Sequence, residues 1–256
     1  LEGLFFCDCF RGVMKDSKEI RPIVWENRIL KLLDQTRLPI ERVTVDITNY
    51  RDAVVAIRDM QVRGAPAIGV TAAYAVAMAA EEILASENDG FIKALEVACK
   101  EIALARPTAV NLEWAVQRML DLATSRSDSP DIIKELFLGA EEIHKDDELI
   151  NRKMGAFGQE LLADRNAVLT HCNAGALATV AYGTALGVIR ATKESGKNVK
   201  VIATETRPVQ QGSRLTAFEL QHDGFDVSLI PDTAVGYTMT NGLVDKVVVG
   251  ADRIVR

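Results

Sequence analysis

One short segment of the chain, Thr170-His171-Cys172-Asn173-Ala174-Gly175, places a reactive residue type where a strand is expected to end. The apolar run 167–169 precedes it, and small residues with helical spacing follow it from 176 to 191. A strand that ends in a glycine-containing turn and opens a helix directs backbone N–H groups and a helix dipole at one point. A cysteine at that point is favoured as the thiolate, its reactive form. We therefore predict an anion-binding strand end with Cys172 as a catalytic candidate; the alternative is a buried structural cysteine.

A second candidate anion site is the turn Arg63-Gly64-Ala65-Pro66 in the first half of the chain. Gly64 suits the end of one helix, and Pro66 suits the first position of the next. This arrangement exposes backbone N–H groups beside Arg63. Arg106 and Arg207 also stand before Pro at expected helix starts. Three arginines at helix entrances favour a phosphate-bearing small molecule, although a plain helix–helix turn gives the same local pattern.

The elements that carry these residues differ between the two halves of the chain. The first half is expected to form a small β element and then helices. Strands are predicted over 20–25 and 28–33, paired as a hairpin about Glu26-Asn27, and over 43–47. Helices are predicted over 50–62, with Asn49 as N-cap, and over 66–84, 91–105, 111–124 and 131–162, the last of them broken.

The second half alternates between strand and helix patterns. Strands are predicted over 167–170, 199–204, 225–230 and 246–249, with helices over 176–193, 211–221 and 234–243 between them. This order predicts an α/β fold with a Rossmann-like, doubly wound parallel sheet, preceded by a mainly helical N-terminal domain with a small β element. We expect the domains to be residues 1–155 and 156–256.

Polar groups follow each predicted strand of the second half, namely Cys172, Glu205-Thr206-Arg207, Asp232 and Asp252-Arg253. Ligands of such sheets bind beyond the carboxyl ends of the strands. Asp232 precedes a helix and is as well explained as a cap as a catalyst. Asp252 follows the small residues Gly250-Ala251, and a thiol and a carboxylate facing one pocket can act as an acid–base pair. His171 is interpreted as structural because neighbouring strand residues point to opposite faces.

The composition of the 256 residues excludes several kinds of partner. The net charge of −6 and the absence of a basic block argue against nucleic acid. The chain lacks the G-x-G-x-x-G and Walker motifs, so no nucleotide cofactor is expected. Cys7 and Cys9 have no matching Cys or His pair, so no metal site is expected there. No apolar run approaches a membrane span, no secretory signal opens the chain, and cysteine usage fits the reducing cytoplasm.

Long segments of the chain resemble the family of 5-methylthioribose-1-phosphate isomerases. The resemblance extends from about Arg21 to the end, leaving out only the first twenty residues. The matching segments are LLDQTRLP (32–39), IRDMQVRGAPAIG (57–69), ARPTAVNLEWA (105–115), THCNAGALATVAYGTALGVIRA (170–191), ETRPVQQGSRLTAFEL (205–220) and VDKVVVGADRI (244–254).

The resemblance implies a homodimeric enzyme of methionine salvage. Such an enzyme converts 5-methylthioribose 1-phosphate to 5-methylthioribulose 1-phosphate without metal or nucleotide. Carried over by position, the catalytic residues are Cys172 and Asp252. The substrate contacts are Arg63, Gly64, Ala65, Arg106 and Gln211, of which Gln211 carries no signal of its own in the sequence.

The resemblance also implies one departure and two alternatives. In the family the chain continues past GADRI through an Asn-Lys segment whose lysine contacts the substrate, so we expect residues 1–256 alone to be unstable or nearly inactive. A ribose-1,5-bisphosphate isomerase would need a second basic site for its C5 phosphate. A non-catalytic subunit of the translation-initiation nucleotide-exchange factor, which shares the fold, would not need both Cys172 and Asp252.

Overall fold

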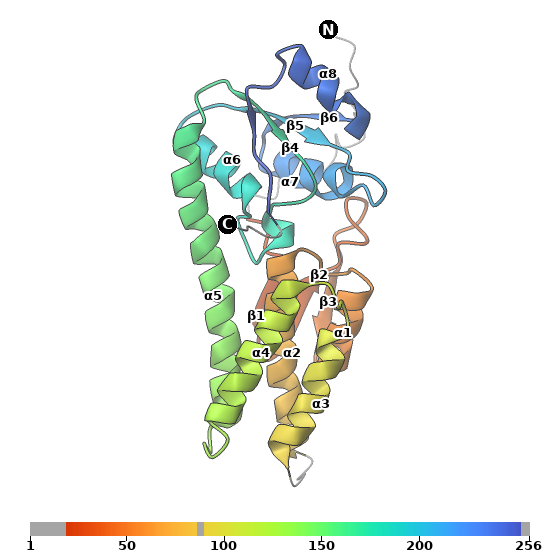
Figure 1. The fold of residues 1–256 in the computed structure, drawn as a ribbon, viewed down its shortest axis with the longest axis vertical. Coiled ribbons are helices and arrows are strands. Elements are labelled where there is room, and N and C mark those ends of the chain that lie inside the picture. The colour runs from red at the N-terminus through yellow and green to blue at the C-terminus, as the bar shows by residue number, and fades with distance from the viewer. Residues whose placement is uncertain (1–18, 86–89, 252–256) are drawn as a thin grey trace. The chain divides into compact units, whose positions relative to one another are not determined.

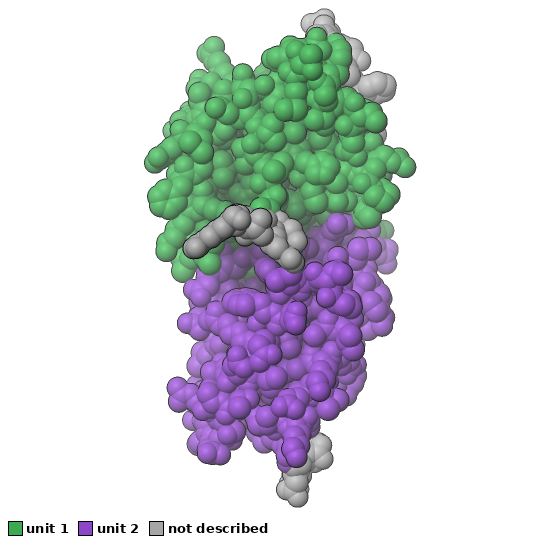
Figure 2. Space-filling view, viewed as in Figure 1, with its two compact units in different colours: residues 1–20, 38–41, 148–256 green, residues 21–37, 42–147 purple. Residues whose placement is uncertain are grey.

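The computed structural model describes residues 19–85 and 90–251, which fall into two compact units (Figures 1 and 2). Of the described residues, 19–20, 38–41 and 148–251 belong to unit 1, and 21–37, 42–85 and 90–147 belong to unit 2. The division falls inside helix α5 (Ile132–Gly158), between Asp147 and Glu148. The domain boundary expected from the sequence, between residues 155 and 156, lies in the same helix.

Unit 2 begins with a three-stranded antiparallel sheet in the order β1 (Ile23–Glu26), β2 (Ile29–Leu33), β3 (Thr44–Ile47). The predicted hairpin is confirmed, but its turn is at Asn27-Arg28, one residue later than predicted, because Glu26 pairs with Ile29. Both turn residues have positive φ, as a two-residue hairpin turn that matches strand twist requires. Leu30 and Leu32 point inward and are fully buried, which fixes the register of the central strand.

Helices complete unit 2 in close agreement with the sequence periodicity. They are α1 (Tyr50–Arg58), α2 (Ala65–Ala85), α3 (Phe91–Ala103), α4 (Val110–Ser125) and the first part of α5. Asn49 is the N-cap of α1, as predicted, because its side-chain oxygen accepts the N–H of Asp52 at 3.0 Å. The predicted break in α5 is wrong: the helix is continuous over 27 residues and passes into a 3₁₀ turn (Gln159–Leu161).

Helix α2 is the buried centre of unit 2. All residues from Ala67 to Ala80 are buried. The expectation that no apolar run approaches a membrane span was wrong: among the residues the structure describes, α2 is long and apolar enough to cross a bilayer. In this structure 78% of the apolar stretch of α2 is buried inside the protein, as in a core helix. The interior of unit 2 therefore accounts for the apolar character of α2.

Unit 1 contains a four-stranded parallel sheet in the order β6-β5-β4-β7. The strands are β4 (Ala167–Thr170), β5 (Lys200–Thr204), β6 (Asp226–Ile230) and β7 (Lys246–Val247). Helices α6 (Ala185–Glu194), α7 (Ala217–His222) and α8 (Val235–Thr240) alternate with them (Figure 1). Val168 of β4 and Leu186 of α6 are fully buried in its core. The predicted α/β fold with a parallel, Rossmann-like sheet is confirmed.

Two predicted helices of unit 1 differ from the structure. The segment 176–193 is not one helix: a 3₁₀ turn (Ala176–Ala178) and an irregular stretch come first, and α6 begins only at Ala185. The predicted helix 211–221 begins with a π-helical turn (Gly212–Thr216) before α7. Both differences lie directly beside the strand ends, where contacts with neighbouring strands override helical periodicity.

Candidate functional site

The order in which the chain adds strands to the parallel sheet of unit 1 reverses between β4 and β7. From β4 the chain adds β5 and β6 on one side and then returns to place β7 on the other side of β4. In parallel α/β sheets, ligands bind beyond the carboxyl ends of the strands at such a switch point. The segments that leave β4 and β7 are close together, since a Cβ on Gly250 would lie 3.0 Å from Cβ of Ala174. The sheet thus has one preferred place for a ligand. Cys172 lies there, because it follows β4, the inner strand at the switch point.

Cys172 is held by hydrogen bonds at its backbone and at its thiol. Its N–H donates to Oγ1 of Thr206 at 2.9 Å, and its carbonyl accepts the hydroxyl of Thr216 at 2.6 Å. Its φ is +64°, in the left-handed region that a non-glycine residue adopts only at a cost. The Sγ atom lies 3.4 Å from Nε2 of Gln211, which is placed to donate to it. The thiol is half-buried, so it is a defined and accessible group.

Gln211 reaches Cys172 because Gly212 lets the chain after β5 fold back closely. A Cβ on Gly212 would overlap the carbonyl oxygen of Thr204, the last residue of β5. Oε1 of Gln211 is buried and has no hydrogen-bond partner in the part of the chain that the structure describes. The side chain therefore combines an amide donor on the thiol with an acceptor that a ligand can use. The structure brings together Cys172 and Gln211, two of the residues expected in the site.

A buried carboxylate, Glu219, accepts the backbone N–H groups that the sequence assigned to an incoming anion. Its Oε2 accepts the N–H of Ala176 at 2.7 Å, and its Oε1 accepts the N–H of Leu177 at 3.1 Å. The predicted anion-binding helix N-terminus after β4 is therefore wrong, because the protein's own carboxylate fills that position and α6 begins later. Gly175 is required here, since a Cβ on it would overlap the Glu219 carboxylate.

Arg190 balances the charge of Glu219. Its Nη2 lies 2.9 Å from Oε2 of Glu219 and 2.6 Å from Oδ2 of Asp223. Burial lowers the pKa of Arg190, but the two carboxylates more than offset this effect and hold the pKa above its usual value. The loop that carries Cys172 is thus built on an internal ion-pair network.

Asp232 supports the backbone after β5. Its Oδ1 accepts the N–H of Thr206 at 2.9 Å, and its Oδ2 accepts the N–H of Arg207 at 2.8 Å. The bond from Arg207 is the largest cause that lowers the pKa of Asp232, so the carboxylate form is favoured. Both oxygens are occupied by backbone donors, which argues for a cap on this loop and against a catalytic acid. His171 bonds through Nδ1 to Oγ1 of Thr204 at 2.7 Å, in agreement with the structural role predicted for it.

The remaining expected site residues are in unit 2 or outside the described residues. Gly64, with φ of +98°, immediately precedes α2, which begins at Ala65. Arg63 and Arg106 are half-buried and lie in the turns before α2 and α4, respectively. A Cβ on Gly69 would come within 3.0 Å of the Asn111 carbonyl oxygen, so the N-terminal ends of α2 and α4 lie side by side. Asp252, Cys7 and Cys9 lie outside the described residues.

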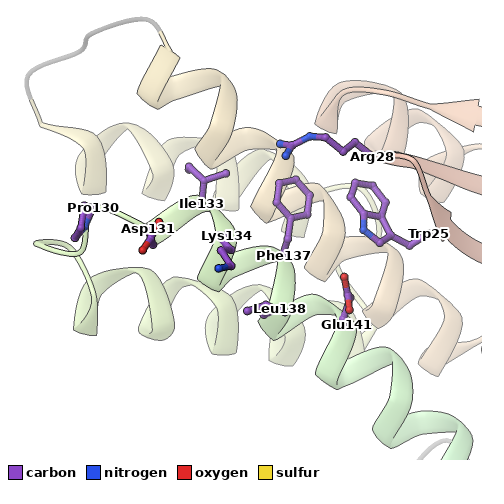
Figure 3. Close-up of a pocket in the computed structure, with 9 residues that line it drawn as sticks. All are labelled: Trp25, Arg28, Pro130, Asp131, Ile133, Lys134, Phe137, Leu138 and Glu141. Atoms are coloured by element: carbon purple, nitrogen blue, oxygen red, sulfur yellow. The ribbon is translucent and has the colours of Figure 1, made fainter.

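Unit 2 also has a hollow, of about 430 Å³, in which none of the predicted site residues takes part (Figure 3). Trp25 and Phe137 stack there with ring centroids 5.0 Å apart, and the guanidinium of Arg28 lies over the Phe137 ring at 5.2 Å. Arg28 also pairs with Glu81. The two aromatic rings and Arg28 of this hollow are thus engaged with one another and with Glu81.

Two residues that hold the Cys172 loop were not singled out from the sequence: Thr216 and Glu219. The one available signal is Glu219 itself, a carboxylate among the apolar residues of the segment LTAFEL. A charged residue on the buried face of a helix requires internal partners, which predicts a network of this kind. Thr216 carries no comparable signal.

Comparison with known proteins gives consistent relatives. Residues 61–256 match the model of the Initiation factor 2 subunit family. A methylthioribose-1-phosphate isomerase of Acetivibrio thermocellus is 52% identical over 239 residues, which cover 92% of this chain and 69% of that protein. A crystal structure of 5-methylthioribose 1-phosphate isomerase from Pyrococcus horikoshii OT3 is 38% identical with a TM-score of 0.85, covering 93% of this chain and 67% of that one.

A second solved structure has a different description. The crystal structure of the translation initiation factor eIF-2B, subunit delta, from A. fulgidus is 48% identical with a TM-score of 0.81, covering 93% of this chain and 69% of that one. Both enzymes and translation-factor subunits are therefore similar to this chain.

Proposed function

We propose that this chain, which belongs to the Initiation factor 2 subunit family as one of its methylthioribose-1-phosphate isomerases, converts 5-methylthioribose 1-phosphate to 5-methylthioribulose 1-phosphate by acid–base catalysis at Cys172 and Asp252. The chain is a sugar-phosphate isomerase, and this reaction belongs to methionine salvage. The observation that carries the catalytic assignment is the contact between Sγ of Cys172 and the Gln211 amide at the switch point of the sheet.

The reaction needs one group at the ring oxygen and another at C1 and C2 of the sugar. The phosphate on C1 prevents spontaneous ring opening, so the ring oxygen must gain a proton as its bond to C1 breaks. A hydrogen then moves from C2 to C1 while the C2 hydroxyl loses its proton and becomes the ketone. We assign the proton on the ring oxygen to Asp252 and the acid–base role beside C1 and C2 to Cys172. The Gln211 amide, 3.4 Å from Sγ, orients the Cys172 side chain for this role.

We assign the substrate phosphate to Arg63, Gly64, Ala65 and Arg106. The adjacent N-terminal ends of α2 and α4 support this assignment because the first turn of a helix generally directs backbone N–H groups and a positive dipole end outward. Gln211 adds a contact elsewhere on the substrate, because its Oε1, which has no partner among the residues that the structure describes, can accept a sugar hydroxyl. The proposal includes a cytoplasmic homodimer; light scattering after size-exclusion chromatography measures the oligomeric state.

The test follows the substrate by NMR with the full-length gene product and its Cys172→Ser variant. We expect the parent to form the ketose and the variant, folded by circular dichroism, to lose at least about a hundredfold in kcat. Substrate labelled with deuterium at C2 shows how the hydrogen travels, since transfer as hydride retains the label at C1 and proton exchange releases it to water. A folded Cys172→Ser variant with parental kcat would refute the assignment of Cys172.

The same assay separates the two alternatives. A folded parent that isomerises ribose 1,5-bisphosphate and not the methylthio sugar would be a ribose-1,5-bisphosphate isomerase. A folded parent that acts on neither sugar would support the non-catalytic subunit, the alternative favoured by the 48% identity to the structure described as eIF-2B subunit delta.

A further inference from the structure

Two residues in the strained left-handed region touch each other at the strand ends of unit 1. Cys172 has φ of +64° and Thr206 has φ of +59°. For a β-branched residue such as Thr206 this conformation is a genuine outlier. Strained backbone of this kind persists only where its surroundings over-determine it.

The surroundings of Thr206 form a chain of hydrogen bonds across three neighbouring strands. The carboxylate of Asp232, after β6, accepts the N–H groups of Thr206 and Arg207, after β5. Oγ1 of Thr206 in turn accepts the N–H of Cys172, after β4, at 2.9 Å. The Thr206 carbonyl also accepts the N–H of Gln210 at 2.8 Å, directly before Gln211. Thr206 is therefore bonded to Cys172 itself and to Gln210, the neighbour of Gln211 in the chain.

We propose that Thr206 and Asp232 are positioning residues for Cys172. Asp232 fixes the backbone of Thr206 in the left-handed conformation. The Thr206 oxygen then holds the Cys172 N–H so that Sγ faces the amide of Gln211. The lowered pKa of Asp232 agrees with this role, because a carboxylate accepts two N–H groups and a protonated acid does so poorly. The expected change in kcat rests on the proposed function of Cys172, whereas the expected change in the alkylation rate of its thiol does not.

The experiment compares Thr206→Val, which keeps the side-chain shape and loses the acceptor, with Thr206→Ser, which keeps the oxygen. Asp232→Asn is the second test, since its amide offers one acceptor oxygen where the carboxylate offers two. The matched control is Thr192→Val in α6, a fully buried threonine whose hydroxyl bonds to the Val188 carbonyl of its own helix. Each variant is measured for kcat, KM and the rate of iodoacetamide alkylation of Cys172 by peptide mass spectrometry.

We expect Thr206→Val and Asp232→Asn to lower kcat by about tenfold or more, with KM changed less than about twofold, because the contact with the reacting thiol is lost and substrate binding is kept. Alkylation of Cys172 should slow by at least about threefold, since the thiolate loses its amide donor. Thr206→Ser should recover most of both values, and Thr192→Val should leave both unchanged.

The proposal is overturned if folded Thr206→Val keeps the parental kcat and alkylation rate, or if Thr206→Ser is as impaired as Thr206→Val. If Thr206→Val does not fold, Asp232→Asn decides, and unchanged values there overturn the proposal. If the parent does not turn over the methylthio sugar, the proposed function fails, and the alkylation rates alone decide whether Thr206 and Asp232 position the thiol.

Discussion

Replacing Glu219 by glutamine tests whether a buried carboxylate organises the loop that carries Cys172. The Glu219 side chain is fully buried. It accepts the backbone N–H groups of Ala176 and Leu177 and the side-chain amide of Asn173, the last at 3.0 Å. Its fourth partner is the guanidinium of Arg190. Glutamine has the same shape, but it keeps one acceptor oxygen and turns an NH₂ group toward these donors.

The expected cost follows from the partners that are left behind. Removing one member of a buried ion pair costs about 3–5 kcal/mol. Arg190 retains Asp223, which places the ion-pair loss near the lower end of that range. At least one of the buried donors then loses its acceptor, which costs about 1–3 kcal/mol more. We therefore expect Glu219→Gln to lower the free energy of unfolding by about 4–6 kcal/mol, a large part of the total of about 5–15 kcal/mol for a domain.

The assay is urea unfolding followed by circular dichroism, with linear extrapolation of the free energy to water. Glu160→Gln is the matched control, because Glu160 is exposed on the 3₁₀ turn after α5 and should change stability by less than about 0.5 kcal/mol. A Glu219→Gln variant within about 1 kcal/mol of the parent would refute the reasoning. It would mean that the N–H groups of Ala176 and Leu177 can find other acceptors at little cost.

Two further predictions concern titratable groups. The pKa of Asp232 is lowered in the folded state, so the stability that its carboxylate contributes is complete above about pH 4 and is lost as the pH falls through the folded-state pKa. The difference in unfolding free energy between the parent and Asp232→Asn should therefore shrink from about pH 7 to about pH 3. A difference that stays constant over this range would contradict the bond to Thr206. Burial, aided by the charge of Glu96, raises the pKa of Cys99 to about 12. Iodoacetamide at about pH 8 should therefore label Cys172 well before Cys99 in the folded protein. Equal labelling of the two peptides would show that Cys99 is not buried.

The order of the elements and the class of the fold follow from local patterns in the amino-acid sequence. Asn49 predicts the start of α1, and the residues about Asn27 predict a hairpin, because caps and turns depend on neighbours in the chain. The β-α alternation after residue 164 predicts a parallel sheet, since apolar runs show which strands are covered on both faces. Cys172 could be located at a strand end for the same reason. The roles of Arg63, Arg106 and Asp252 remain predictions from family resemblance.

The shape of the site depends on contacts between residues far apart in the chain. Helical spacing after Gly175 gave the wrong start for α6, because Glu219, far along the chain, accepts the N–H groups that would begin the helix. The left-handed conformations of Cys172 and Thr206 depend on hydrogen bonds between residues that follow three different strands. Local periodicity carries no information about partners so distant in sequence. Propensity therefore predicts which elements form, while buried polar contacts decide where each one begins and how its side chains meet.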